Sequence, residues 1–203
     1  LLACQGVHVV GISITGMGEA GLIVDRRTGK EKTEILPWFD GRTRELAGRE
    51  DPEKEGEIFR KTGLRNSYKY GIYKFLWLLE QTKMEKTDAV WLSMCDYIAW
   101  KLTGRLATEP GFAARTYIYD IVEGCWDAAR IREYGLEVSN FPEVVLSGSI
   151  AGMYQTADGR RIPVAIAGHD HICAAFALLH QDGSGICDSA GTSGTYVGKL
   201  KGK

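Results

Sequence analysis

The sequence predicts an α/β fold in which helices flank a mixed central sheet. Short apolar runs rich in β-branched residues alternate with segments whose apolar residues recur at helical spacing. Some neighbouring apolar runs are separated only by short glycine-containing turns, which is typical of antiparallel hairpins. With 203 residues, 44% hydrophobic and 25% charged, the chain can bury the core of one large domain, or of one domain and part of a second.

Charge and composition exclude several classes of partner. The net charge is −1 and no basic block occurs, so we expect no binding to nucleic acid. The apolar runs are too short to cross a membrane, so we expect no membrane partner. Five cysteines lie scattered without a C-x-x-C pair, which favours reduced thiols in a cytoplasmic protein over a disulfide framework or a zinc site.

The first part of the chain predicts a strand, a hairpin and then helices. Residues 7–14 form a continuous β-branched run that ends at glycines, as a buried strand does. Residues 22–25 and 33–36 flank a glycine-containing turn and predict a hairpin. Helices are expected at 43–49, 52–61, 71–82, 94–102 and 126–134, with Asp51 and Ser93 as N-caps and a strand at 88–92.

The last part of the chain returns to strands. We expect two strands, at 147–155 and 161–167, joined by a turn at 157–160. A helix is then expected from Asp170 to about residue 180, followed by a final hairpin at 183–188 and 192–197. No internal repeat and no low-complexity tract is visible.

The segment 16–21 is a literal G-x-G-x-x-G, and Asp40 follows at about the distance of the ribose-binding acid in a dinucleotide-binding unit. In such a unit the motif opens a helix whose N-terminus meets the pyrophosphate. Here the strand-like run 22–25 leaves no room for that helix, so we expect the glycines to form a tight turn with Glu19 at its tip. A dinucleotide-binding oxidoreductase is therefore the rival hypothesis, and it fails if 22–25 is a strand.

Asp170 lies where a predicted strand passes into a predicted helix. Open α/β sheets bind their ligands at such places, beyond the carboxyl ends of strands. An aspartate with an ordinary pKa is ionised at neutral pH and can accept a proton from a hydroxyl. The alternative is a plain helix N-cap. His169 and His171 flank Asp170, but no third ligand is evident, so we predict no metal site.

Three further segments could bind ligands, each with a structural alternative. The turn 191–194 offers backbone N–H groups and two hydroxyls to a phosphate, although it is also suited to an ordinary hairpin turn. Residues 38–42 combine an aromatic ring, a carboxylate and a guanidinium, which suits a sugar, or a core tryptophan beside a surface ion pair. Glu19 alone would be a solvated turn residue. The aromatic residues Tyr68, Tyr70, Tyr73 and Trp77 predict core packing, with one tyrosine at the edge of a pocket.

Taken in order, these segments resemble the FGGY family of carbohydrate kinases over nearly the whole chain. The similarity lies in segments 11–25, 38–42, 96–104, 114–120 with Trp126, 167–170 and 191–194. Each motif is weak alone, whereas six in series at fitting spacing are specific. The resemblance implies an actin-like, ribonuclease H-like ATPase fold, with two such domains around a cleft and transfer of the ATP γ-phosphoryl group to a sugar or polyol hydroxyl.

The resemblance also implies roles for individual residues. Asp170 matches the general base, and ATP with Mg²⁺ would be the cofactors. Substrate-binding positions match Glu19, Trp38, Asp40 and His171, and the positions near the nucleotide phosphates match Gly191, Thr192, Ser193 and Gly194. Residues 1–182 would be the sugar-binding N-terminal domain without its first strands, and 183–203 the start of the nucleotide-binding domain. A homodimer is among the expected forms.

Departures from the family pattern limit these expectations. The opening strand with its Asp-Gly-Thr phosphate loop does not precede Leu1, and the second domain does not follow Lys203. We therefore expect the 203 residues alone not to turn over ATP. Gly18 stands where glycerol kinases carry a basic residue, and Gly-His-Asp-His differs from the form in xylulose kinases, so the substrate stays open. A non-catalytic, sugar-binding remnant of the kinase fold is the alternative.

Overall fold

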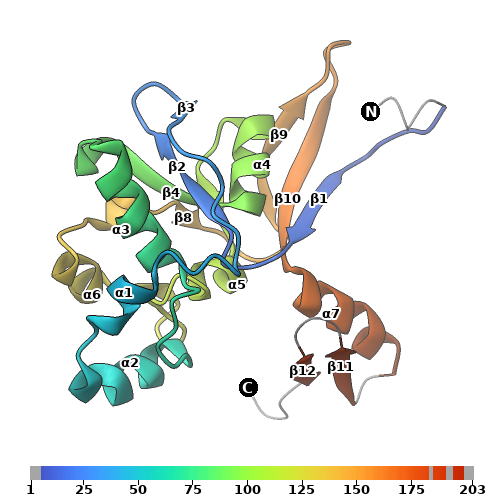
Figure 1. The fold of residues 1–203 in the computed structure, drawn as a ribbon. Helices are drawn as coiled ribbons and strands as arrows, with labels where there is room; N and C mark the ends of the chain where they lie inside the picture. Colours follow the sequence, from blue (N-terminus) through green and yellow to red (C-terminus); the bar gives the residue numbers. More distant parts are fainter. Residues whose placement is uncertain (1–5, 183–184, 191–193, 199–203) are drawn as a thin grey trace.

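The computed structural model describes residues 6–182, 185–190 and 194–198, and it confirms the α/β class. Within these residues two three-stranded sheets form the centre (Figure 1). In one sheet, β1 is parallel to β10 and β9 is antiparallel to β10; in the other, β2 is antiparallel to both β3 and β4. The strand bounds are β1 (Ile12–Gly16), β2 (Gly21–Asp25), β3 (Lys30–Glu31), β4 (Ala89–Ser93), β9 (Ile150–Gln155) and β10 (Arg161–His169).

Helices cover both faces of the β3-β2-β4 sheet. The helix bounds are α1 (Arg44–Gly48), α2 (Glu55–Thr62), α3 (Gly71–Thr82), α4 (Met94–Thr103), α5 (Pro110–Ala114), α6 (Ala128–Glu133) and α7 (Asp170–Asp182). Helix α3 packs on β2 and β4 from one side, and α4 packs on them from the other while also contacting β1, β9 and β10 (Figure 1). Helix α4 therefore ties the two sheets together. No helix among the described residues has the length and apolar character needed to cross a membrane.

Short strand pairs complete the architecture. These are β5 (Ala107–Thr108) with β8 (Glu143–Val144), β6 (Tyr119–Asp120) with β7 (Cys125–Trp126), and β11 (Ile186–Ala190) with β12 (Gly194–Gly198). The β11–β12 hairpin packs against α7, below the two central sheets in Figure 1.

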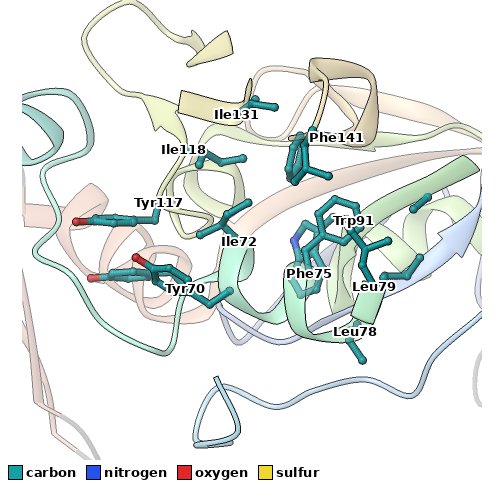
Figure 2. Close-up of a cluster of buried hydrophobic side chains, with 14 of the residues drawn as sticks. Tyr70, Ile72, Phe75, Leu78, Leu79, Trp91, Tyr117, Ile118, Ile131 and Phe141 are labelled. Atoms are coloured by element: carbon teal, nitrogen blue, oxygen red, sulfur yellow. The ribbon is translucent and has the colours of Figure 1, made fainter. Parts of the chain in front are cut away.

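The main core lies between β2, β4 and helix α3. Because successive side chains of a strand point to opposite faces, Ile23 and Trp91 face α3, whereas Leu22 and Leu92 face α4. Figure 2 shows Phe75 in this core, packed against both Trp91 and Phe141. The indole also crosses the backbone of β2: a Cβ atom at Gly21 would lie 2.3 Å from Trp91 Cζ2. Glycine is therefore required at the start of β2 because an aromatic ring occupies the space of a side chain.

Most predicted elements are confirmed, but two strands are shorter than expected. The strand predicted at 7–14 begins only at Ile12, and Val7 and Val10 are 66% and 73% exposed. Pro163 of the partner strand β10 has no N–H to donate, so pairing begins at Ile12 opposite Val164. The strand predicted at 33–36 is reduced to one bridge between Gly21 and Leu36, and β2 pairs instead with β3.

Two boundaries also move, and one rival hypothesis is excluded. The strand predicted from residue 147 begins at Ile150, after a turn at Gly148 whose φ is +74°. The helix predicted from residue 126 begins at Ala128, because Asp127 caps it by accepting from the backbone N–H groups of Ala129 and Arg130.

Residues 21–25 form strand β2, so no helix follows the G-x-G-x-x-G segment and dinucleotide binding of that kind is excluded.

Helix α4 begins with the expected cap. Ser93 Oγ accepts from Asp96 N at 3.1 Å, and Asp96 Oδ2 accepts from Ser93 N at 3.1 Å, which forms a capping box. The Asp96 carboxyl is buried at the start of α4, and this burial raises its pKa to about 7 despite the hydrogen bonds from Ser93. Above that pH the fold carries a charge in its interior.

This burial predicts a pH-dependent stability. In the unfolded chain Asp96 loses its proton near pH ~4, whereas in the fold it keeps the proton up to about pH 7. Its contribution to stability is therefore complete below about pH 4 and is lost as the pH rises through 7. We expect Asp96→Asn, which keeps an acceptor for Ser93 N, to raise the free energy of unfolding at pH 8 by roughly 1–4 kcal/mol relative to the unmodified chain. Chemical denaturation at pH 5 and pH 8 measures this, and an equal difference at both pH values would contradict it.

Candidate active site

Parallel pairing of β1 and β10 brings two distant segments together. Gly16, the last residue of β1, lies opposite His169, the last residue of β10. The carboxyl ends of both strands therefore open at the same edge of the sheet, where α/β proteins place their ligands. The turn that carries Glu19 leaves one strand end, and Asp170, the first residue of α7, leaves the other.

An irregularity in the pairing turns the end of β10. Ile14 lies opposite Ile166, but Thr15 lies opposite Gly168, so one residue of β10 is skipped. Gly168 has a φ of +133°, which favours glycine, and its carbonyl accepts from Thr15 Oγ1 at 2.8 Å. The bulge and this hydrogen bond fix the direction in which His169 and Asp170 leave the sheet.

A cavity of about 420 Å³ lies at this edge. It is lined by Met17, Gly18, Glu19, Trp38, Lys69, Arg115, His169, Asp170, His171 and Thr195. The structure thus brings together four of the predicted site residues, Glu19, Trp38, Asp170 and His171. The volume of the cavity is in the range of small-molecule sites, and acidic, basic and aromatic side chains all border it.

Glu19 is a buried wall of this cavity rather than a solvated turn residue. Its backbone adopts a left-handed φ of +56°, and its side chain is only 9% exposed. The carboxylate accepts from Arg115 Nε at 2.7 Å and from Arg115 Nη2. The Arg115 guanidinium in turn lies over the ring of Tyr70, 5.4 Å from its centre. The pair leaves the second carboxylate oxygen, Oε2, without a hydrogen bond from any described residue.

Trp38 reaches the cavity because β2 holds the end of the hairpin. Gly21 and Leu36 exchange two backbone hydrogen bonds, which places Trp38 near the turn that carries Glu19. Its indole borders the cavity, and the ammonium of Lys69 lies 5.2 Å from the centre of the indole ring. A flat aromatic face beside charged groups can stack on the apolar face of a sugar ring while polar neighbours bind its hydroxyls.

Asp170 presents a half-exposed carboxylate to the cavity. Its side chain is 49% exposed, and Oδ1 accepts from His171 N at 2.8 Å and lies 3.2 Å from His169 Nδ1. No group in the described part of the chain binds Oδ2, which is available to a ligand hydroxyl. Both contacts fix the carboxylate, and its exposure allows it to accept a proton.

The two histidines flank Asp170 in different settings. The rings of His169 and His171 stack with their centres 5.2 Å apart. Burial lowers the pKa of His169, so its imidazole is neutral at physiological pH. His171 Nδ1 lies 2.8 Å from Ser189 Oγ, which connects α7 to β11. Among residues 6–182, 185–190 and 194–198, no three His, Cys, Asp or Glu side chains converge on a common metal position.

Asp40 does not line the cavity. Its carboxylate is bound by Arg42, with Nη2 2.7 Å from Oδ2 and Nε 2.9 Å from the same oxygen. These hydrogen bonds hold the pKa of Asp40 below its usual value. Residues 191–193 of the predicted phosphate turn lie outside the described residues. Gly194 is the first residue of β12, and its neighbour Thr195 borders the cavity.

Sequence reasoning assigned no role to Arg115 or Lys69, and it considered His169 only as a metal ligand. Arg115 is 96 positions from Glu19 in the sequence. It follows α5, and its carbonyl accepts from Gly71 N at 3.1 Å, the first residue of α3. Only the tertiary fold could reveal this pairing. The one sequence signal was the place of Arg115 within the segment 114–120, which resembles a family motif.

Comparison with known proteins agrees with this geometry. Residues 3–177 match the sequence profile described as "FGGY family of carbohydrate kinases, N-terminal domain". A glycerol kinase from Shewanella amazonensis is 31% identical over 191 residues, which cover 88% of this chain and 39% of that protein. The chain therefore spans about two fifths of the length of this relative.

Solved structures show the same fold. A Plasmodium falciparum glycerol kinase with ADP has a TM-score of 0.74 at 25% identity, covering 85% of this chain and 37% of that one. A gluconate kinase from Lactobacillus acidophilus has a TM-score of 0.81 at 20% identity, covering 96% of this chain and 41% of that one. These likenesses confirm the actin-like, ribonuclease H-like fold that the resemblance implied.

The close contact between Gly18 and His169 predicts that a side chain at position 18 would destabilise the fold. A Cβ atom at Gly18 would lie 2.6 Å from His169 Cδ2 and 3.3 Å from Arg115 Cγ. We expect Gly18→Ala to displace the His169 ring and to lower the free energy of unfolding by about 1–3 kcal/mol. Denaturant titration measures the loss, and the NMR signals of the His169 ring report the displacement. Gly48→Ala is the matched control, because no atom lies within 4 Å of a Cβ atom there. Equal behaviour of the two variants would contradict the prediction.

Proposed function

The chain belongs to the FGGY family of carbohydrate kinases, and from that premise we propose that it contributes to ATP-dependent phosphorylation of a sugar or polyol hydroxyl. In this proposal the chain supplies the sugar-binding part of the active site. The glycerol kinases and other sugar kinases to which it is similar act on small polyhydroxy substrates, as their names say. The cavity at the ends of β1 and β10 has the size and chemistry that such a substrate needs.

Asp170 is the proposed general base. The observation that supports this assignment is the half-exposed carboxylate of Asp170, which lies in one cavity with Trp38 and Glu19. Its Oδ1 is fixed by His171 N and His169, and no described residue binds its Oδ2. Oδ2 would accept the proton of the substrate hydroxyl as its oxygen forms a bond to the γ-phosphorus, while the bond to the ADP oxygen breaks. Such catalysis depends mainly on holding the hydroxyl in line with the phosphoryl group.

The remaining cavity residues would bind the substrate. The Trp38 indole would stack on an apolar face of the substrate, and Glu19, oriented by Arg115, would accept from its hydroxyl groups. His171 would be a polar contact beside the base. Asp40 stays a predicted substrate contact, and its carboxylate would first have to exchange a hydrogen bond from Arg42 for one from the substrate.

Nucleotide and metal binding follow from the family rather than from the cavity. ATP would supply the phosphoryl group, with Gly191, Thr192, Ser193 and Gly194 near its phosphates. Mg²⁺ usually takes one or two protein carboxylates together with phosphate oxygens and water. No cage of three ligating side chains is present among the described residues, so the ion would be held largely through the nucleotide. The proposed division places the sugar-binding domain at 1–182 and the start of the nucleotide-binding domain at 183–203.

The identity of the substrate within this class stays open. The sequence similarity to glycerol kinases is moderate, and in this chain the imidazole of His169 fills the space beside Gly18, where those enzymes are expected to carry a basic side chain. A cytoplasmic location and a homodimer stay predictions. The second candidate function is a non-catalytic remnant that binds a sugar through the same cavity, and it shares every binding residue with the kinase.

The decisive experiment compares Asp170→Asn with the unmodified protein. The complete gene product that contains this chain is assayed with Mg·ATP against a panel of polyols, ketoses and sugar acids. We expect Asp170→Asn to lower kcat by about 10²- to 10⁴-fold with little change in KM, because a general base is lost while the binding residues are kept. Asparagine also retains an acceptor for His171 N, so helix α7 is preserved.

Asp158→Asn is the matched control, since Asp158 lies in an exposed turn and pairs with Arg160. Phosphorylation of a sugar that survives Asp170→Asn would overturn the role of Asp170. Binding of a sugar without any phosphorylation would favour the non-catalytic alternative.

A separate assay concerns the 203-residue chain alone. We expect it to show no sugar-dependent ATP hydrolysis, because the chain spans 39% of the length of the glycerol kinase that it matches and the family's phosphate loop and adenine pocket are predicted to lie outside that part. A coupled assay for ADP, with and without the sugar that the complete protein uses, measures this. Sugar-dependent release of ADP by the chain alone would contradict the prediction.

A further inference from the structure

Lys74 is a buried lysine behind the cavity. It lies on α3, and its relative exposure is 0%, with apolar neighbours in the chain such as Ile72 and Phe75 that belong to the main core. Moving an ammonium ion out of water is costly, by several kcal/mol even after the protein relaxes. Burial accordingly lowers the pKa of Lys74 to about 8, so the side chain is still charged at neutral pH. The fold therefore keeps an internal charge that packing alone does not require.

The contacts of Lys74 point toward the cavity. Its ammonium donates to the carbonyl oxygen of Lys69 at 2.8 Å. In the described residues no carboxylate lies within ion-pair distance of it. The charged groups that face it are the carboxylates of Glu19 and Asp40, which favour its charged form, and the ammonium of Lys69, which opposes it. Lys74 thus lies between the main core and the groups that border the cavity.

The segment that Lys74 holds forms part of the cavity wall. Lys69 borders the cavity with its ammonium over the Trp38 indole. The next residue, Tyr70, supports the guanidinium of Arg115, which binds Glu19. Tyr70 is the N-cap of α3 but makes no side-chain cap. The backbone N–H groups of Gly71 and Ile72 donate instead to the carbonyls of Arg115 and Thr116, and the hydrogen bond from Lys74 to Lys69 adds a side-chain contact to the residue before the cap.

We propose that Lys74 is a positioning residue of the cavity. It fixes Lys69, and through Lys69 and the adjoining Tyr70 it holds the side chains of Trp38 and of the Arg115–Glu19 pair that border the cavity. This inference rests on the proposed function of the cavity. Lys74 touches no reacting atom, so it acts on sugar binding and not on the phosphoryl transfer itself. Its positive charge also adds to the effect of Arg42, whose hydrogen bonds lower the pKa of the Asp40 carboxyl.

The test uses Lys74→Met in the complete gene product. Methionine has a similar length and no charge, and buried charges replaced by apolar side chains of similar volume often leave stability equal or higher. We expect an unchanged or raised midpoint of thermal unfolding, a rise of about tenfold in KM for the sugar, and little change in kcat. A residue that served only packing would leave KM unchanged.

Lys86→Met is the matched control. Lys86 also donates its ammonium to backbone carbonyls, those of Tyr134 and Gly135, but it does not border the cavity. We expect Lys86→Met to leave KM for the sugar unchanged. If both variants change KM equally, the effect is general and the proposal is overturned.

A pH profile gives a second readout. In the unmodified protein, KM for the sugar should rise as the pH passes about 8, because Lys74 loses its proton there and its hydrogen bond to Lys69 weakens. Lys74→Met should lack this rise. Identical profiles, or Lys74→Met with unchanged KM in an active enzyme, would overturn the inference and leave the proposed function intact. If the unmodified protein neither phosphorylates nor binds any sugar, the proposed function fails, and the inference fails with it.

Discussion

The site depends on the parallel pairing of β1 with β10. This ladder places Gly16 beside His169, and so brings the turn with Glu19 to the start of α7. Without it, the turn with Glu19 and the start of α7 would have no reason to meet. The bulge at Gly168, fixed by Thr15, then sets the direction in which Asp170 leaves the sheet. A backbone pattern, and not the attraction between charged side chains, therefore determines where the carboxylates lie.

Around this edge, Glu19 and His171 are each held by a second polar residue. Arg115 binds Glu19 with its side chain and accepts from Gly71 N with its carbonyl, so the same residue serves the cavity and the start of α3. His171, the neighbour of Asp170, connects α7 to β11 through Ser189. Such shared contacts keep the side chains in place before any ligand arrives, and preorganisation of this kind is what catalysis by positioning requires.

Local patterns in the sequence predicted the local structure well. The cap at Ser93, the helix at 71–82 and the strand-to-helix junction at Asp170 each follow from residues within a few positions of one another, and all are confirmed. The exclusion of a dinucleotide motif likewise needed only the strand-like run after it.

What the sequence alone could not show are pairings between distant residues. The partner of Glu19 is 96 positions away, and nothing in the composition of either segment selects Arg115 over other arginines. Asp40 is a contrasting case, since its ion pair with Arg42 is only two residues away in the sequence and competes with the predicted substrate contact. The helical periodicity of α3 likewise marks Lys74 only as a polar residue among apolar ones, and its buried position becomes visible only in the fold.

The separation between β1 and β10 also has a consequence for biosynthesis. Thr15 and Gly168 are 153 positions apart, whereas β2 and β4 meet over a much shorter stretch of chain. At ribosomal rates of about 5–20 residues per second, β1 waits roughly 8–30 s for its partner strand to be made. During that interval the edge of β1 is open to pairing with other chains. The sheet edge that carries the cavity is thus completed only after β10 has been made, and the unpaired edge of β1 is exposed to aggregation before that step.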